Sequence, residues 1–180
     1  MFKLGITGNI ASGKSQVEKI LENNGFKVYD LDIVAHEFLK NNNKIYNHFH
    51  TLDRKKIAEI VFSDENEKKY LESILHPLLY NFVLDEFKKN YNKIAISGAL
   101  LFEAGFDKLF DKIIFVDAPY DIRLKRLMNR NNLSENTAKL RLNVQNNNYK
   151  NKADYIIQNS TTLDDLKKTI NLILLDFEQI

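Results

Sequence analysis

The chain has 180 residues, no cysteine and a formal net charge of +2 at pH 7. Without cysteine there is no disulfide framework, thiolate metal site or cysteine nucleophile, and the small charge argues against nucleic acid as a partner. No apolar run reaches membrane-spanning length and no signal segment precedes the first predicted strand, so we expect no membrane partner. These features predict one cytoplasmic domain. We expect a monomer or weak homo-oligomer, although the sequence itself does not give the oligomeric state.

Apolar runs typical of strands alternate along the chain with patterns at helical spacing. The predicted strands cover residues 2–7, 26–29, 93–97, 112–116 and 154–158. The predicted helices cover residues 14–24, 32–40, 54–62, 65–90, 120–130, 134–147 and 162–178. This alternation indicates an α/β fold, a five-stranded parallel sheet flanked by helices. Residues 33–90 carry only helical patterns, which predicts a helical insertion between the second and third strands.

Residues 8–15 read Gly-Asn-Ile-Ala-Ser-Gly-Lys-Ser and match the phosphate-loop pattern G-x-x-x-x-G-K-[ST]. The match lies between a predicted strand and a predicted helix, where such a loop belongs. Gly8 and Gly13 let the backbone turn tightly and aim its N–H groups at an anion beside the helix N-terminus. Lys14 is expected to reach the β- and γ-phosphates, and the Ser15 hydroxyl to hold Mg²⁺. The motif predicts a nucleoside triphosphate site.

Two carboxylates end the second predicted strand. Alternation along an extended chain puts Asp30 and Asp32 on the same side. Ligands of parallel sheets bind beyond the carboxyl ends of the strands, so we expect both residues to lie in one cleft with the phosphate loop. There a carboxylate can orient an attacking hydroxyl and take its proton. The alternative for Asp32 is an N-cap of the next helix.

The chain has 21 lysines but only five arginines, and four of these arginines lie between residues 123 and 141. Arg123, Arg126 and Arg130 are spaced i, i+3, i+7, which places them on one helix face. Arginines in this position could close over a triphosphate and stabilise the charge on the moving phosphoryl group. The alternative is an ordinary solvated helix face.

One histidine stands directly before a proline inside a long helical pattern. Pro77 should kink or break the helix predicted over residues 65–90 and push His76 away from ideal helical geometry. A histidine near a kink fits a structural role as readily as a functional one.

Two other classes of nucleotide-binding protein do not fit. Asn151-Lys-Ala-Asp154 matches the N-K-x-D string of GTPases, but it precedes a predicted strand instead of following one. No glycine has an aspartate three residues before it, so the D-x-x-G motif is missing as well. A transporter-type ATPase does not fit because no apolar strand ends in Asp-Glu.

Several segments share an order along the chain. They are Thr7–Ser15, Asp30–Asp32, Leu75–Leu78, Leu100–Glu103, Leu124–Arg130, Gln145 and Ala153–Asn159. In this order they resemble the dephospho-coenzyme A kinases, and the resemblance covers nearly the whole chain. It implies a P-loop kinase fold over residues 1–180, with a core of residues 1–32 and 91–180. It further implies a helical acceptor-binding insertion at about 33–90 and a lid at about 123–150.

The resemblance also implies an activity. Enzymes of this family transfer the γ-phosphate of ATP to the ribose 3′-hydroxyl of dephospho-coenzyme A, with Mg²⁺. The implied catalytic residues are Asp32 as the base, Lys14 and Arg126. The implied nucleotide ligands are Gly8, Ala11, Ser12, Gly13, Lys14, Ser15, Gln16, Arg130 and Asn159, with Ser15 as the metal ligand and Asn159 near the adenine. The implied acceptor ligands are Asp30, Arg54, His76 and Glu103.

The chain departs from the family pattern in a few places. Asn9 and Ala11 occupy loop positions where glycine is common, and Ala99 stands where proline is usual. These changes bear on loop and lid geometry and leave the phosphate ligands in place. Two alternatives stay open: another P-loop kinase acting on a nucleoside monophosphate or similar small molecule, and a nucleotide-binding regulator without an acceptor site.

Overall fold

The computed structural model describes residues 1–143 and 149–177. By their contacts these residues form two compact units. The sheet unit contains Met1–Val28 and Asn92–Ile180, and the helical unit contains Tyr29–Tyr91. Gln145 and the end of the helix predicted to residue 147 lie outside the described residues. Within the described ranges, no helix is long and apolar enough to cross a membrane.

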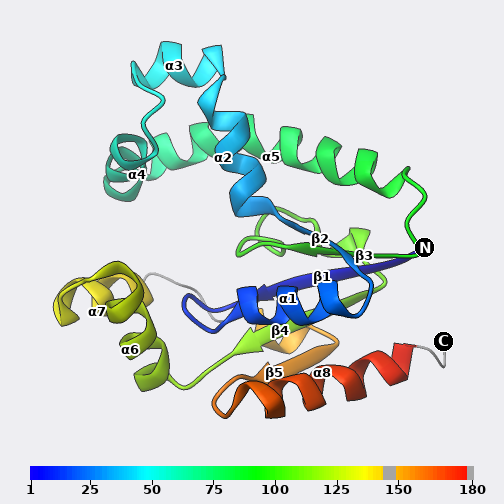
Figure 1. The fold of residues 1–180 in the computed structure, drawn as a ribbon. Helices are drawn as coiled ribbons and strands as arrows, with labels where there is room; N and C mark the ends of the chain where they lie inside the picture. The colour runs from blue at the N-terminus through cyan, green and yellow to red at the C-terminus, as the bar shows by residue number, and fades with distance from the viewer. Residues whose placement is uncertain (144–148, 178–180) are drawn as a thin grey trace. The chain divides into compact units, whose positions relative to one another are not determined.

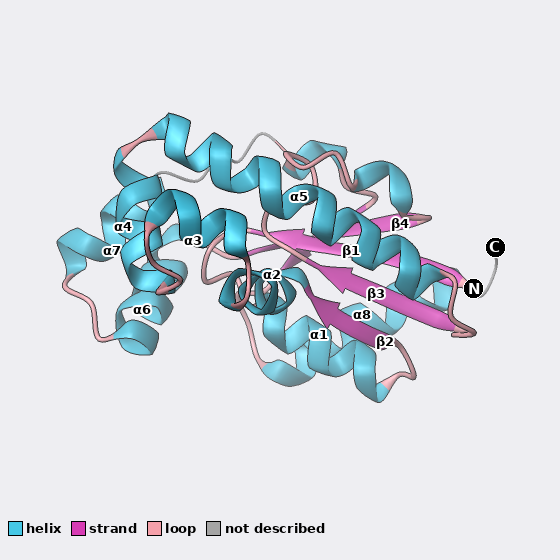
Figure 2. Cartoon of the chain, turned by 90° about the horizontal axis from the view of Figure 1, so that it is seen from above, coloured by secondary structure: helices cyan, strands magenta, loops and turns pink. Residues whose placement is uncertain are grey.

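A five-stranded sheet organises the first unit, with strand order β2-β3-β1-β4-β5 (Figure 1). The strands are β1 (Phe2–Gly8), β2 (Lys27–Asp30), β3 (Lys93–Ser97), β4 (Lys112–Asp117) and β5 (Tyr155–Gln158). β1 pairs in parallel with β3 and β4, and β4 pairs in parallel with β5. The arrows of β1 and β3 run side by side in the same direction in Figure 2. The predicted parallel sheet is confirmed, and its central strand leads into the phosphate loop, residues 8–15.

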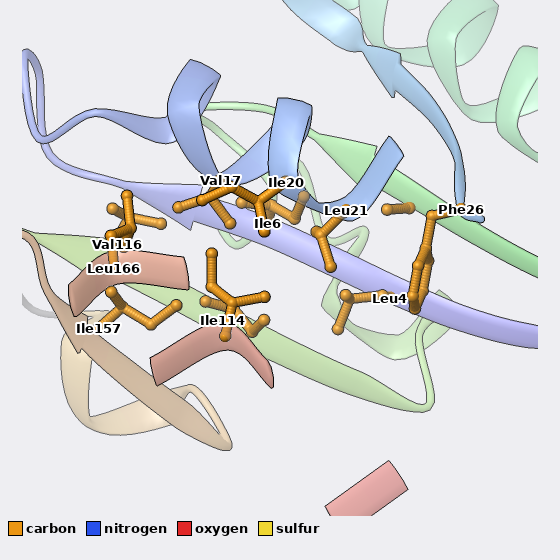
Figure 3. Close-up of a cluster of buried hydrophobic side chains, with 12 residues drawn as sticks. Leu4, Ile6, Val17, Ile20, Leu21, Phe26, Ile114, Val116, Ile157 and Leu166 are labelled. Atoms are coloured by element: carbon orange, nitrogen blue, oxygen red, sulfur yellow. The ribbon is translucent and has the colours of Figure 1, made fainter. Parts of the chain in front are cut away.

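One face of the sheet packs against α1 (Lys14–Asn23) and α8 (Leu163–Phe177), which also contact each other. Figure 3 shows apolar side chains from the strands meeting those of the two helices. The buried cluster consists of Leu4, Ile6, Val17, Ile20, Leu21, Phe26, Ala95, Ile114, Val116, Ile157, Leu166 and Ile170. Burying one such aliphatic side chain is worth about 1.5–3 kcal/mol. This cluster therefore fixes α1 on β1 and β4, and with it both ends of the phosphate loop.

A helical pair follows β4 in the sheet unit. It consists of α6 (Tyr120–Asn131) and α7 (Glu135–Asn143), which contact each other around buried Leu127, Ala138 and Leu142. Short 3-10 turns at Asp107–Leu109 and Lys150–Lys152 precede β4 and β5.

The second unit is helical. Its helices are α2 (Leu31–Lys40), α3 (Asn43–Phe49), α4 (Arg54–Ser63) and α5 (Glu65–Phe87). They enclose a buried cluster of Leu39, Ile45, Phe49, Ile57 and Leu75. Each of these helices has a side-chain N-cap, from Asp30, Asn42, Asp53 and Asp64 respectively. α3 is absent from the predicted helices because it has only seven residues, too few to show a clear apolar period.

α5 continues through Pro77, so the predicted break does not occur. Proline has no N–H to donate to the Ser73 carbonyl four residues earlier, so the helix lacks that bond. Leu75 and Leu79 are buried on either side of the proline, so packing holds the helix across this gap.

Candidate active site

The phosphate loop requires glycine at two positions, Gly8 and Gly13. A Cβ at Gly8 would lie 2.1 Å from the Val116 carbonyl oxygen of β4. Gly13 has φ +100°, and a Cβ there would lie 2.1 Å from the Asn159 Nδ2 atom. The loop is thus packed directly against β4 and the segment after β5, which leaves no room for side chains at these two positions.

The N-terminus of α1 is arranged to bind an anion. Gly13 is the N-cap and offers no side-chain hydrogen bond, in contrast to the aspartate and asparagine caps of the helical unit. Helix geometry leaves the N–H groups of Lys14 and Ser15 without an acceptor inside the helix. The first turn contains no acidic residue and does contain the Lys14 ammonium. Backbone donors, helix dipole and lysine together favour a phosphate here.

The Ser12 carbonyl ties the loop to two other elements. It accepts hydrogen bonds from Arg126 Nη1 at 3.1 Å and from Asn159 Nδ2 at 2.8 Å. Asn159 Nδ2 also donates to Gln16 Oε1 at 3.1 Å. The structure thus brings the cationic head of Arg126 to the loop, and its expected action on a triphosphate stays a prediction. The buried Asn159 amide nitrogen bonds to the loop and to α1, and its implied role near the adenine stays a prediction.

The tip of the loop packs against the helical pair. Ile10 and Ala11 contact the cluster formed by Leu127, Ala138 and Leu142. Ala11 adopts φ +61°, a left-handed conformation that costs a residue with a Cβ about 1–2 kcal/mol. This accounts for the usual glycine at this position, and the contact of the Ala11 methyl with α6 and α7 offsets part of the strain.

Asp117, which the sequence did not single out, connects the loop to β4. Its Oδ1 accepts hydrogen bonds from Asn9 Nδ2 at 2.7 Å and from the Ala118 N–H at 2.8 Å. Its Oδ2 accepts from Lys150 Nζ at 2.7 Å. Burial favours a raised pKa for this carboxyl, but the bonds from Lys150, Asn9 and the Ala118 backbone outweigh it and lower the pKa. The available signal was the position of Asp117 at the carboxyl end of a strand, the rule that identified Asp30.

The arginines of α6 do not act alike. Arg123 is buried, and its Nε donates to the Ala118 carbonyl at 3.0 Å, so it is a structural residue of the helix N-terminus. Arg126 is half-buried on the loop, whereas Arg130 is exposed one turn further along. The helix face that the spacing defined is therefore divided between a buried arginine and two that are accessible.

In the helical unit, the structure changes the expected roles of the two aspartates. α2 already begins at Leu31, so Asp30 ends the strand and Asp32 lies in the first helical turn. The alternation argument is wrong here, because it requires extended backbone through residue 32. Asp30, and not Asp32, is the N-cap: its Oδ1 accepts the Asp32 N–H at 2.8 Å. The Asp32 residue is exposed, and its backbone is fixed by Asp30.

The remaining predicted acceptor residues lie apart in sequence. Arg54 is the exposed first residue of α4, and His76 is half-buried on α5. Burial lowers the pKa of His76, with Glu72 opposing the shift and Lys68 adding to it. Glu103 is exposed in the turns that follow β3 in the sheet unit. The single cleft expected for both groups of residues stays a prediction.

Comparison with known proteins gives one consistent result. The profile of the dephospho-CoA kinase family matches residues 2–165. Dephospho-CoA kinases from Fusobacterium nucleatum and Helicobacter pylori are 36% and 37% identical, over 93% and 95% of this chain and 94% and 95% of theirs. The solved dephospho-CoA kinase from Campylobacter jejuni is 31% identical with a TM-score of 0.70, covering 98% of this chain and 97% of its own. The fold is therefore that of the P-loop kinases.

Proposed function

The chain belongs to the dephospho-CoA kinase family, and we propose which of its residues perform the reaction. The reaction transfers the γ-phosphate of ATP to the ribose 3′-hydroxyl of dephospho-CoA and gives CoA and ADP, the final step of CoA biosynthesis. The assignment of roles rests on two cations at the phosphate loop. Lys14 is the first residue of α1, whose N-terminus has no side-chain cap, and Arg126 Nη1 lies 3.1 Å from the Ser12 carbonyl oxygen.

The phosphate loop and α6 bind and polarise the triphosphate in this proposal. The first-turn N–H groups of α1 and the Lys14 ammonium hold the β- and γ-phosphates. Arg126 and Arg130 neutralise the negative charge that the transferring phosphoryl group spreads over its oxygens. The other proposed nucleotide ligands surround the phosphates, and Asn159 holds two of them by hydrogen bonds to Ser12 and Gln16. These ligands are Gly8, Ala11, Ser12 and Gly13 of the loop and Gln16 of α1. Ser12 Oγ fits this role because it is buried without a hydrogen-bond partner among the described residues.

Ser15 is the proposed ligand of Mg²⁺. Its hydroxyl is a hard oxygen donor on an exposed residue in the first turn of α1, beside the phosphate cradle, and therefore suits this ion. The ion, held at Ser15, would supply positive charge to the phosphate oxygens.

In this proposal, residues of the helical unit activate the 3′-hydroxyl of the acceptor. Asp32 accepts the proton of the 3′-hydroxyl as that oxygen attacks the γ-phosphorus. Asp30 positions Asp32 by capping α2. His76, Arg54 and Glu103 bind the acceptor: Arg54 by charge, Glu103 through hydroxyl or amine donors, and His76 as a neutral imidazole, consistent with its lowered pKa.

The organisation of the chain is part of the same proposal. The sheet unit is the nucleotide-binding core, the helical unit is the acceptor-binding insertion, and α6 with α7 forms the lid. We infer a cytoplasmic enzyme that acts as a monomer or weak homo-oligomer, without nucleic acid or membrane. The absence of cysteine fits a compartment in which disulfides do not form.

The test measures ADP release with ATP and a panel of acceptors: dephospho-CoA, AMP, CMP, dTMP and shikimate. Stimulation by dephospho-CoA alone supports the proposal. Stimulation by another acceptor supports a different P-loop kinase, and nucleotide binding without any stimulated release supports a regulator. The Lys14→Ala variant should lose both ATP binding and turnover; normal kinetics in it would contradict the roles given to the loop.

A further inference from the structure

Asp117 is the point at which three segments around the phosphate loop meet. Its carboxylate binds Asn9 Nδ2 through one oxygen and Lys150 Nζ through the other, both at 2.7 Å. Its backbone carbonyl accepts the Asn159 N–H at 2.7 Å. Asn9 is in the loop, and Lys150 and Asn159 lie before and after β5. Asp117 thus links the loop to both ends of the neighbouring strand, through its side chain at Asn9 and Lys150 and through its backbone at Asn159.

The contact to the loop depends on a residue that is unusual for this position. Asn9 stands where glycine is common, and a glycine would have no side chain to bond the Asp117 carboxylate. Asn9 is 4% exposed, and its backbone is held as well: its N–H donates to the Val116 carbonyl at 3.2 Å, and its carbonyl accepts the Ser12 N–H at 3.0 Å. A shift of the Asn9 side chain would therefore also move the loop backbone at Asn9 and Ser12.

The orientation of the Asn9 amide is fixed by Asp117. A carboxylate only accepts, so the Asn9 nitrogen must face it, and the Asn9 oxygen must point the other way. That oxygen is buried and has no hydrogen-bond partner in the part of the chain that the structure describes. A buried acceptor without a donor is unfavourable by itself. Asn9 keeps this arrangement because the charge-assisted bond that its nitrogen donates to Asp117 outweighs the cost of the unpaired oxygen.

We propose that Asp117 is a positioning residue for phosphoryl transfer, which acts through the Asn9 side chain to set the geometry of the phosphate loop, with Lys150 neutralising its charge. The proposal rests on the proposed role of the loop in ATP binding. Asp117 touches no phosphate in this scheme. Its function is to keep the loop N–H groups at the spacing that a triphosphate needs, and to keep its own negative charge matched by Lys150 so that it does not repel the nucleotide.

A matched control is available in Asp154, which directly precedes β5 and bonds to residues of β4. Asp154 accepts the Ile113 N–H of β4 at 2.8 Å and pairs with Lys112 at 3.4 Å. It therefore combines one backbone donor and one lysine, as Asp117 does, but at the opposite end of β4 and away from the loop. Asp154→Asn reports the purely structural cost of losing such a carboxylate.

The experiment compares Asp117→Asn, Asn9→Ala, the double variant and Asp154→Asn. ATP affinity is measured by calorimetric titration without acceptor, thermal unfolding is followed separately, and ADP release with dephospho-CoA gives KM and kcat. Misplacement of binding groups by about 1 Å can cost up to about a hundredfold. We expect Asp117→Asn to weaken ATP binding by about tenfold or more and to raise KM for ATP, with a smaller change in kcat.

The double variant distinguishes positioning through Asn9 from general damage. If Asp117 acts through Asn9, Asp117→Asn should weaken ATP binding far less in the Asn9→Ala background than in the wild type. Additive effects in the two backgrounds would overturn the proposal. So would equal ATP affinity in Asp117→Asn and Asp154→Asn when both lose similar thermal stability. Should Asp117→Asn fail to fold, Asn9→Ala alone decides: unchanged ATP affinity overturns the proposal.

These outcomes are separate from the test of the reaction. Calorimetric binding of ATP needs no acceptor, so the positioning role can fail while the wild-type chain phosphorylates dephospho-CoA. Conversely, wild-type protein without dephospho-CoA-stimulated ADP release would contradict the roles given to the acceptor residues and leave the binding comparison intact.

Discussion

The Asn159 amide occupies the space that a side chain at Gly13 would need, since a Cβ at Gly13 would lie 2.1 Å from Asn159 Nδ2. The two residues are far apart in sequence and meet because β1 and β5 flank β4 on opposite sides. Asn159 also holds the Ser12 carbonyl, so the same amide excludes a side chain from one loop position and bonds the neighbouring one. The segment after β5 therefore fixes the conformation of the loop at Ser12 and Gly13.

Gly13→Ala should abolish tight ATP binding. The new methyl group would displace Asn159 and break its bond to Ser12, and the φ of +100° is strained for alanine. Gly25→Ala is the matched control, because Gly25 has φ +83° but nothing within 4 Å of an added Cβ. We expect Gly25→Ala to lose about 1 kcal/mol of unfolding free energy with unchanged ATP affinity. Calorimetric titration and urea unfolding check both; equal ATP affinities would contradict the steric argument.

Asp32→Asn should lower kcat strongly and leave ATP binding nearly unchanged. An amide cannot take the proton of the acceptor hydroxyl, and loss of a general base costs about 10²–10⁴-fold. Steady-state ADP release with dephospho-CoA measures kcat, and calorimetry measures the binding of ATP. A variant with wild-type kcat would remove Asp32 from the role of base.

Asp30 can be tested through the stability of α2. Asparagine is as good an N-cap as aspartate, so Asp30→Asn should keep the unfolding free energy within about 0.5 kcal/mol of the wild type. Asp30→Ala loses the bond to the Asp32 N–H and should cost about 1 kcal/mol. Denaturant titration of both variants checks the difference. If the two were equally stable, Asp30 would not be the cap.

Substitutions of Arg126 and Arg123 should affect different properties, the first the turnover and the second the stability of the protein. Arg126→Ala removes a cation from the phosphate loop and should lower kcat by about 10²–10³-fold with little loss of stability. Arg123→Ala removes a buried side chain that bonds the Ala118 carbonyl and should cost about 1–3 kcal/mol of unfolding free energy. Thermal unfolding and ADP release on both variants give the comparison. A large kcat loss in Arg123→Ala with intact stability would reverse this division.

The sequence predicts the sheet and the phosphate loop well because their signals are local. The apolar run before Gly8 and the helical period after Lys14 are enough to define β1, the loop and α1. The end of β2 is different. Asp30, Leu31 and Asp32 read equally well as strand or as helix start, and what decides is the bond from the Asp32 N–H to the Asp30 carboxylate. The apolar pattern of the sequence does not show this hydrogen bond. The predicted helix therefore starts at residue 32, one residue later than α2 in the structure.

Long-range contacts explain the rest. Nothing in the spacing of Asn9 and Asp117 indicates that they bond, because they are joined only through the pairing of β1 with β4. Likewise, Arg123 and Arg126 share a helix face by periodicity, and only the packing of α6 buries one and brings the other to Ser12. Such roles follow from the tertiary arrangement, which sequence periodicity does not contain.

His76 should make the stability of the protein depend on pH. Burial lowers its pKa, because the charged imidazolium loses hydration, while the unfolded chain titrates near pH 6.5. Below about pH 6.5 the unfolded state binds more protons than the folded state, so the free energy of unfolding falls as the pH decreases. His76→Gln removes this contribution, and the variant should lose less stability than the wild type between about pH 7.5 and 5. Urea unfolding at several pH values measures the difference, in which the other histidines cancel. A difference between wild type and variant that is constant with pH would show that His76 is not desolvated in the folded state.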